Sequence, residues 1–71
     1  MEILVFKTDI HNNTEVEAIS PLLETLPMVS RWNVDLYDID KILRIESEEA
    51  CARNIEAVLQ KAGFYCEELE D

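Results

Sequence analysis

The residues best suited to hold a ligand lie in one short polar stretch near the N-terminus. Asp9, His11, Asn12 and Glu15 fall between positions 9 and 15 of the chain. Imidazole and carboxylate donors together suit a borderline or harder cation such as Zn²⁺, Ni²⁺ or Mn²⁺. Their spacing is not diagnostic of a metal motif, and the same residue types favour turns and helix starts. Two interpretations are therefore open, a divalent-cation site and a solvated loop that begins a helix.

The two cysteines, Cys51 and Cys66, could in principle form one disulfide bond. From Cys51 to the end of its predicted helix is roughly 16 Å, at about 1.5 Å per residue. The returning strand recovers roughly 10 Å or less before Cys66. The remaining gap is near or beyond the limit of roughly 7 Å between Cα atoms. We therefore expect no intrachain disulfide and interpret both cysteines as small buried hydrophobic residues.

The sequence gives little support to an enzyme. Catalysis needs a nucleophile beside a base, or two carboxylates held in a pocket, and a chain of 71 residues offers little concavity. His11 is the single histidine, and it has no cysteine or serine partner at a recognisable spacing. The many carboxylates are spread along the whole chain, which is typical of side chains on a solvated surface. We expect no catalytic residues.

The composition describes one small folded domain, residues 1–71, because hydrophobic residues make up 48% of the chain and charged residues 31%. Sixteen acidic against six basic residues give a formal charge of −10. Such a charge repels nucleic acid and anionic membranes. The apolar run Ile3–Phe6 is too short for a signal peptide or a membrane span. We expect a cytoplasmic protein with neither of these partners.

Four short segments are rich in β-branched and aromatic residues or alternate in polarity, which predicts strands at 2–8, 31–36, 42–46 and 64–69. Trp32 shares a face of its strand with other apolar residues and is expected in the core. Between the strands, apolar residues recur at helical spacing and predict two helices.

Each predicted helix has its own start and stop signals. Thr14 and Glu17 fit a capping box at the start of the first helix. Pro21 is expected to kink or divide that helix, because it removes an intrahelical hydrogen bond. Ser47 is expected to cap the second helix, with Glu48 and Glu49 in its first turn.

The end of the second helix and the order of the elements complete the prediction. Gly63 follows the last apolar position and is expected to end this helix in a left-handed conformation. The order is then β-α-β-β-α-β. Right-handed crossovers place two helices on one face of a four-stranded antiparallel sheet, with the first and third strands central. The sequence therefore predicts an α+β fold, the ferredoxin-like βαββαβ plait.

Three short sequences in this order resemble the heavy-metal-associated domain of copper chaperones and metal-transporting ATPases. They are Leu26-Pro27-Met28-Val29 after the first helix, Val34-Asp35-Leu36 in the second strand, and Gly63-Phe64 at the end of the second helix. The family has Leu-Pro-Gly-Val, Val-Asp-Leu and Gly followed by an aromatic residue at these places. The resemblance covers nearly the whole chain and implies the same scaffold.

The resemblance does not extend to the metal motif of the family. That motif is Met-x-Cys-x-x-Cys in the loop after the first strand, where two thiolates hold Cu(I) or Zn(II). Counting back from Ile19 puts Ile10 at the methionine, and Asn12 and Glu15 at the two cysteines. The resemblance therefore implies a copper-chaperone-like scaffold that lacks the Cys-x-x-Cys site and has no resident cofactor.

The open face of the predicted sheet is a candidate interface. The family pattern turns alternate residues of the first strand toward the helices, namely Leu4, Phe6 and Thr8. Ile3 and Val5 then project from the open face, beside Ile42 and Arg44 of the neighbouring strand. An apolar patch there suggests a homodimer or a protein partner, although isolated exposed hydrophobic residues are common. Tyr37 or Tyr65 could extend the patch.

Two functions follow from these observations. The first is a non-enzymatic heavy-metal-associated-like domain with a degenerate metal site, acting as a protein-interaction or regulatory module. The second is a metal-binding or transport protein that takes a divalent cation at His11, Asn12 and Glu15, with Asp9 nearby.

Overall fold

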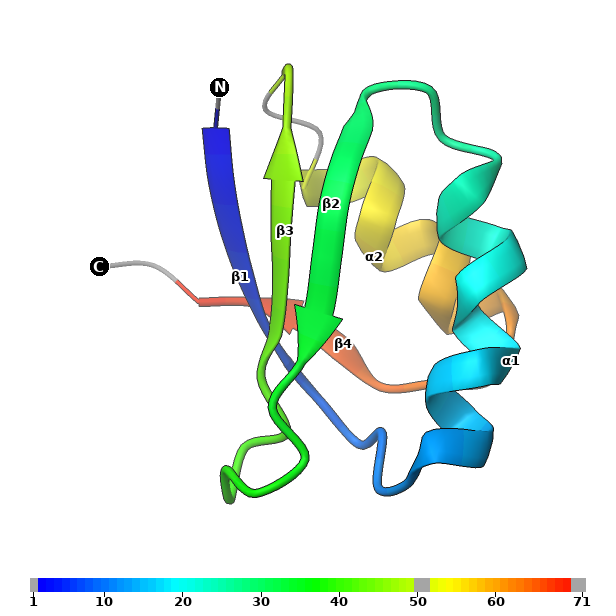
Figure 1. The fold of residues 1–71 in the computed structure, drawn as a ribbon, viewed down its shortest axis with the longest axis vertical. Coiled ribbons are helices and arrows are strands. Elements are labelled where there is room, and N and C mark those ends of the chain that lie inside the picture. The colour runs from blue at the N-terminus through cyan, green and yellow to red at the C-terminus, as the bar shows by residue number, and fades with distance from the viewer. Residues whose placement is uncertain (1, 50–51, 70–71) are drawn as a thin grey trace.

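A computed structural model describes residues 2–49 and 52–69 of the chain (Figure 1). Its elements follow the order β1 (Glu2–Thr8), α1 (Asn13–Glu24), β2 (Val29–Val34), β3 (Leu43–Ser47), α2 (Ala52–Lys61) and β4 (Cys66–Glu68). The predicted order of strands and helices is therefore confirmed. None of the described helices is long and apolar enough to cross a membrane.

The four strands form one antiparallel sheet in the order β2-β3-β1-β4. The first and third strands are central, as predicted. Figure 1 shows both helices on the same side of this sheet, so that its other face is left open. The α+β ferredoxin-like plait is confirmed.

The core lies between the sheet and the two helices. Along β1, Leu4, Phe6 and Thr8 are buried, while Ile3 is 52% exposed, which is the alternation of a half-buried strand. The buried apolar side chains are Leu4, Phe6, Ile10, Ile19, Leu23, Leu43, Ile45, Ile55, Leu59 and Cys66. Burying one large side chain of this kind is worth about 1.5–3 kcal/mol. Trp32 is partly buried and packs against this core from β2.

The first helix starts earlier than the capping box at Thr14 predicts. Asn12 is the N-cap in extended conformation, and its Oδ1 accepts a hydrogen bond from the backbone N–H of Glu15 at 2.9 Å. Thr14 lies inside the helix. Helix α1 also runs through Pro21 without a break, so the expectation of a divided helix is wrong. The buried side chains of Ile19 and Leu23 on either side hold this part of α1 against the core.

The start of the second helix is also predicted wrongly. Ser47 is the last residue of β3 and is fully buried. Its hydroxyl donates to the backbone oxygen of Glu49 at 2.6 Å, so it stabilises a bend after the strand. Glu48 and Glu49 lie in that bend and precede α2. The part of the helix start that involves Cys51 lies outside the described residues.

The end of α2 is as predicted. Gly63 has a φ of +93°, a backbone conformation that would be strained in a residue with a side chain. The N–H of Gly63 donates to the oxygen of Gln60 at 3.0 Å, and the N–H of Phe64 donates to that of Leu59 at 3.0 Å. These two bonds form a Schellman motif, which satisfies the last carbonyls of the helix.

Three strands differ in their bounds from the prediction. β2 begins earlier than the predicted 31–36. It also ends earlier, because the chain turns at Asp35, whose Oδ1 accepts the N–H of Tyr37 at 3.1 Å. β3 is shifted to Leu43–Ser47, and β4 keeps only Cys66–Glu68 of the predicted 64–69. Alternation of polarity continues through the loops and therefore does not mark where pairing stops.

Candidate functional site

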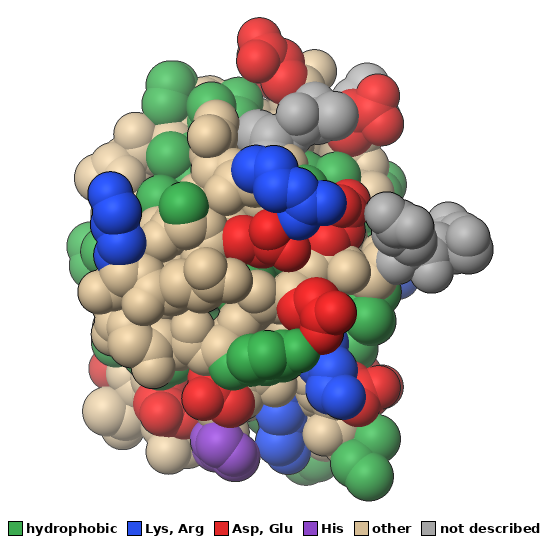
Figure 2. All heavy atoms as spheres, turned by 180° about the vertical axis from the view of Figure 1, so that it is seen from behind, with side chains coloured by type: hydrophobic (Ala, Val, Ile, Leu, Met, Phe, Trp, Pro, Cys, Tyr) green, Lys and Arg blue, Asp and Glu red, His purple; other side chains and the backbone are tan. Residues whose placement is uncertain are grey.

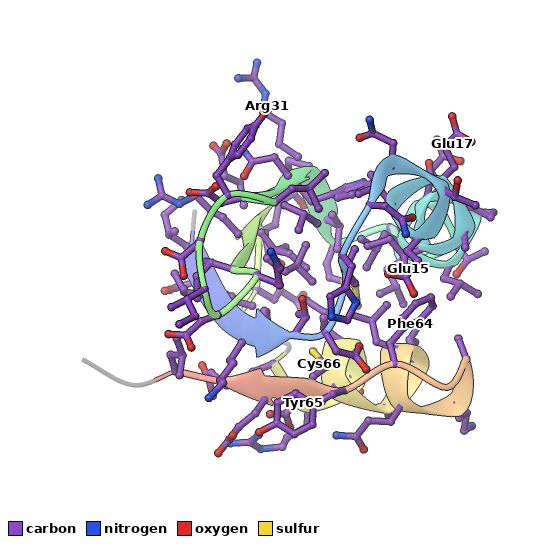
Figure 3. The ribbon with its side chains drawn as sticks, turned by 90° about the horizontal axis from the view of Figure 1, so that it is seen from below. Glu15, Glu17, Arg31, Phe64, Tyr65 and Cys66 are labelled. Atoms are coloured by element: carbon purple, nitrogen blue, oxygen red, sulfur yellow. The ribbon has the colours of Figure 1, made fainter. Side chains whose placement is uncertain are left out.

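The β1–α1 loop holds the candidate ligands, and the start of α1 positions three of them. Glu15 Oε1 accepts the backbone N–H of His11 at 2.7 Å and lies 3.4 Å from His11 Nδ1. Asn12 receives the N–H of Glu15 in return. These contacts satisfy backbone N–H groups at the helix start, which is the usual task of a capping pair. Figure 3 shows Glu15 on the side of α1 that faces the loop, whereas Glu17 points away.

Asp9 binds a different part of the chain from His11, Asn12 and Glu15. Its Oδ1 accepts the backbone N–H of Tyr65 at 3.0 Å, which ties the loop to the segment before β4. The next residue, Ile10, is fully buried, and its N–H donates to Thr8 Oγ1 at 3.2 Å. The loop is thus fastened to the core at its first residues, and one carboxylate oxygen of Asp9 is engaged by the backbone of Tyr65.

The described residues do not fit a complete metal site. They contain no group of three or more His, Cys, Asp or Glu side chains placed to share an ion. A zinc site takes four ligands in structural proteins, or three with an open position in enzymes. His11 and Glu15 supply two donors. The positions of the family's cysteines, Asn12 and Glu15, carry oxygen atoms that cap the helix.

Cys66 lies on β4 and faces the core, on the opposite side of the strand from Tyr65 (Figure 3). It is a free cysteine, 1% exposed. Burial, together with the nearby Glu56 carboxylate, raises the pKa of the Cys66 thiol to about 12. A thiol in this state is a poor nucleophile and a poor metal ligand, which fits its predicted role as a buried hydrophobic residue. Cys51, the other cysteine of that prediction, lies outside the described residues.

The open face of the sheet brings the four candidate interface residues together. Val5 pairs with Arg44 across β1 and β3, and Ile3 pairs with Glu46. Ile42 lies just before β3, and its oxygen accepts the N–H of Asp35 at 2.8 Å, so it continues the same row of side chains as Arg44.

Leu69 adds an apolar residue to this face that the sequence analysis missed. It follows β4, its N–H donates to the oxygen of Val5 at 2.8 Å, and it is 39% exposed. Tyr65 lies on the same strand face and is 46% exposed, so it extends the surface toward the β1–α1 loop. The alternation around Cys66 could have placed Leu69 on this face, because residues 66 and 69 of one strand point to opposite faces. We call Ile3, Val5, Ile42 and Leu69 the sheet-face patch.

Charges of both signs surround the sheet-face patch. Arg31 is exposed on β2 opposite Glu46, and Arg44 is exposed two residues before Glu46 on β3. Lys7 pairs with Glu67 across β1 and β4. Three of the six basic residues of the chain therefore lie on this face. Figure 2 shows the molecule from behind, where acidic and basic side chains are also intermixed.

One hollow lies elsewhere, between α1 and β2. It has a volume of about 300 Å³ and is lined by Leu23, Glu24, Val29, Ser30, Arg31 and Trp32. Neither a histidine nor a cysteine is among these lining residues. The lining therefore offers no Ser–His or Cys–His pair.

The fold is similar to that of the N-terminal domain of ZntA, whose solution structure was solved in the Zn(II) form. The similarity covers 96% of this chain and 92% of that one, with a TM-score of 0.81 and 16% sequence identity. No protein-family model matches the sequence, and no curated protein matches it. The structural similarity shows that the two domains share one fold, and it is consistent with the scaffold that the sequence resemblance implied.

Proposed function

We propose that this chain is a non-enzymatic domain that uses the heavy-metal-associated-like scaffold for protein interaction or regulation. The observation that carries this proposal is the use of the loop residues. Asn12 and Glu15, at the positions of the family's two cysteines, are engaged in capping α1. Asp9 holds the segment before β4. The polar side chains of the loop are therefore engaged in hydrogen bonds to the protein backbone.

The sheet-face patch supports an interaction role. Four apolar side chains lie together on an open sheet surface, with Ile3 52% and Leu69 39% exposed. The charges around them nearly balance, in a chain whose formal charge is −10. A partner can cover this face with less charge repulsion than it would meet elsewhere on the molecule. Apolar patches rimmed by polar residues commonly mark such contacts.

The experiment is affinity capture with the purified chain, comparing wild type with Ile3→Lys. Ile3 lies opposite Glu46, so a lysine there finds a favourable cross-strand neighbour and the fold is retained. Glu17→Gln on α1 is the matched control, because it changes the net charge by the same single unit. We expect specific partners to be lost with Ile3→Lys and kept with Glu17→Gln. Equal capture by all three proteins would contradict the proposal, and sedimentation would show whether the partner is a second copy.

A second candidate function is binding of a divalent cation at the β1–α1 loop. Two observations favour it: His11 Nδ1 lies 3.4 Å from Glu15 Oε1, and the similar ZntA domain was solved in a Zn(II) form. Because these are two donors, the remaining ligands would come from another chain or from water.

A titration of the reduced, metal-free protein with Zn²⁺, Ni²⁺ and Cu⁺, followed by backbone amide NMR shifts, separates the two functions. Saturable one-to-one shifts centred on residues 9–15 that vanish in His11→Ala would establish the cation site. The interaction proposal expects no localised response there. Glu15→Ala is less decisive, because it also removes a helix cap.

A further inference from the structure

The loop between β2 and β3, residues 35–42, presents two large apolar side chains entirely to solvent. Tyr37 is 100% exposed and Ile39 is 93% exposed. The loop projects from the end of the sheet, beside the start of the β1–α1 connection (Figure 1). Single exposed hydrophobic residues are ordinary. Two that are almost completely exposed, separated by the single residue Asp38 at the end of a hairpin, form a distinct apolar protrusion. We call Tyr37 and Ile39 the hairpin tip.

Local hydrogen bonds fix the shape of this loop. Asp35 Oδ1 accepts the N–H of Tyr37 at 3.1 Å, and Asp38 Oδ1 accepts the N–H of Asp40 at 2.7 Å. Both are Asx turns, in which a carboxylate replaces a backbone acceptor. The N–H of Asp38 also donates to the backbone oxygen of Asp35 at 3.3 Å. Two successive turns thus hold Tyr37 and Ile39 outward.

The loop is also tied to the rest of the molecule. Thr8 Oγ1 donates to the backbone oxygen of Lys41 at 2.5 Å. The N–H of Thr8 donates to the backbone oxygen of Asp40 at 3.1 Å. Lys41 Nζ donates to the oxygen of Leu36 at 2.8 Å. Thr8 is 5% exposed, so the loop is fastened to a buried point at the end of β1. The hairpin tip is therefore held in place before any partner arrives.

A fixed apolar protrusion is suited to insertion into a pocket. A loop that is already ordered loses little conformational entropy on binding. Tyrosine is enriched among the residues that dominate binding energy, because it buries a large area with few rotatable bonds. We propose that the hairpin tip inserts into an apolar pocket of a partner protein whose surface around that pocket is basic.

The charges around the hairpin tip identify this partner chemistry. Asp35 and Asp38 form no ion pair within the described part of the chain, whereas Asp40 pairs with Lys7 at 3.6 Å. The carboxylates of Asp35 and Asp38, whose charges are not paired in this way, flank the tip and each accept one backbone N–H. They would attract lysine or arginine at the rim of the pocket. A second copy of this chain, with a formal charge of −10, and an anionic membrane are both disfavoured.

This inference builds on the proposed interaction function and adds a second contact to the sheet-face patch. The test places a photoreactive p-benzoylphenylalanine at one position of the full chain at a time, in the source cells. The positions are Tyr37 for the hairpin tip, Ile3 for the sheet-face patch and Glu17 as a control. Adducts are mapped to the cross-linked peptide, and the identified partner is purified for binding measurements.

We expect an adduct from position 37 that is absent from position 17 and that maps to an apolar segment flanked by lysine or arginine. Ile39→Ser should then weaken binding of the purified partner by about tenfold or more, because a central apolar anchor is lost. Glu17→Gln should leave binding unchanged. Binding should also weaken as salt is raised, since the flanking charges are screened.

Other outcomes separate the tip from the sheet-face patch. Adducts from position 3 alone would overturn the inference about the hairpin tip and support the proposed function. Adducts from position 37 alone would support the tip and move the proposed interface away from the sheet face. An adduct with a second copy of the chain, with an acidic surface, or equally from position 17 would overturn the inference. So would the absence of any adduct.

Discussion

The Glu56 carboxylate links α2 to the last strand. Its Oε2 accepts the backbone N–H of Glu68 at 2.8 Å, and its other oxygen accepts from the Arg53 guanidinium, one turn earlier on the helix. Arg53 also reaches the Glu68 carboxylate at 3.4 Å. The backbone hydrogen bond from Glu68 and the charge of Arg53 hold the pKa of Glu56 below its ordinary value of 4.5.

This link predicts a pH-dependent effect of Glu56→Ala. Because the folded state lowers the pKa of Glu56, its contribution is fully present above pH 4.5 and is lost as pH falls through the lowered value. We expect the variant to lose about 1 kcal/mol of unfolding free energy at neutral pH and much less at low pH. Urea unfolding at several pH values measures this. Glu17→Ala, which removes the same charge from an exposed position, should show no such loss.

The Cys66 thiol gives a second prediction at the scale of one residue. Burial raises its pKa from 9.0 to about 12, so the folded state disfavours the thiolate. In a Cys51→Ala background, alkylation of the folded protein by iodoacetamide near pH 8 should be at least about a hundredfold slower than in urea. The unfolding free energy should also fall as pH rises above the ordinary thiol pKa. Equal alkylation rates in the two states would show that Cys66 is accessible.

The candidate site shows how far single residues can be predicted. Helical spacing and residue type bring His11, Asn12 and Glu15 together, and the structure places all three at the start of α1. The use of Asp9 depends on Tyr65, which is 56 positions away along the chain. A contact of that length follows only from the folded sheet, so the sequence could not show that Asp9 binds the segment before β4.

At the scale of an element, the start of α1 can be used to compare two candidate N-cap residues, Asn12 and Thr14. Asn12 caps the helix in the structure, whereas the sequence favours Thr14 through its spacing from Glu17. Asn12→Ala should cost about 1 kcal/mol of unfolding free energy, because the N–H of Glu15 loses its acceptor. Thr14→Ala, inside the helix and exposed, should change it by less than about 0.5 kcal/mol. Urea unfolding of both variants compares them directly, and a larger loss for Thr14→Ala would restore the first assignment.

Local sequence patterns predict that each strand and helix exists, but they do not predict where most of these elements end. Leu4, Phe6 and Thr8 alternate with exposed residues, so β1 is predicted with its correct bounds. Gly63 marks the end of α2 because a φ of +93° suits glycine. In contrast, β2 stops at Val34 because Asp35 starts a turn, although Leu36 continues the alternation. Side-chain hydrogen bonds that compete with strand pairing are not visible in a hydrophobic pattern.

At the scale of the whole molecule, charge opposes the fold. Sixteen acidic residues share one small domain with six basic residues. Within residues 2–49 and 52–69, the core is built from ten buried apolar side chains between the sheet and two helices. Both the sheet-face patch and the hairpin tip leave further apolar surface uncovered. The isolated domain therefore combines a modest core with strong self-repulsion. A basic partner at the hairpin tip would cover apolar surface and reduce this repulsion at the same time.

This balance predicts that salt stabilises the isolated domain. Raising NaCl from about 0.01 M to about 0.1 M shortens the screening length from about 30 Å to about 10 Å, so repulsion between distant carboxylates weakens. We expect the melting temperature to rise by about 5 °C, equivalent to about 1 kcal/mol for a domain of this size. Calorimetry measures the change.

A variant with a smaller net charge tests whether weaker charge repulsion is the cause of stabilisation by salt. The double variant Glu17→Lys and Glu24→Lys changes two exposed positions of α1, and each change adds two charges, so that −10 becomes −6. If self-repulsion limits stability, this variant should melt higher than wild type at low salt and gain less when salt is added. An equal salt gain in both proteins would mean that NaCl acts on the apolar surface instead. The exposed sheet-face patch and hairpin tip would then be the first places to look, because covering them would stabilise the domain without any change in charge.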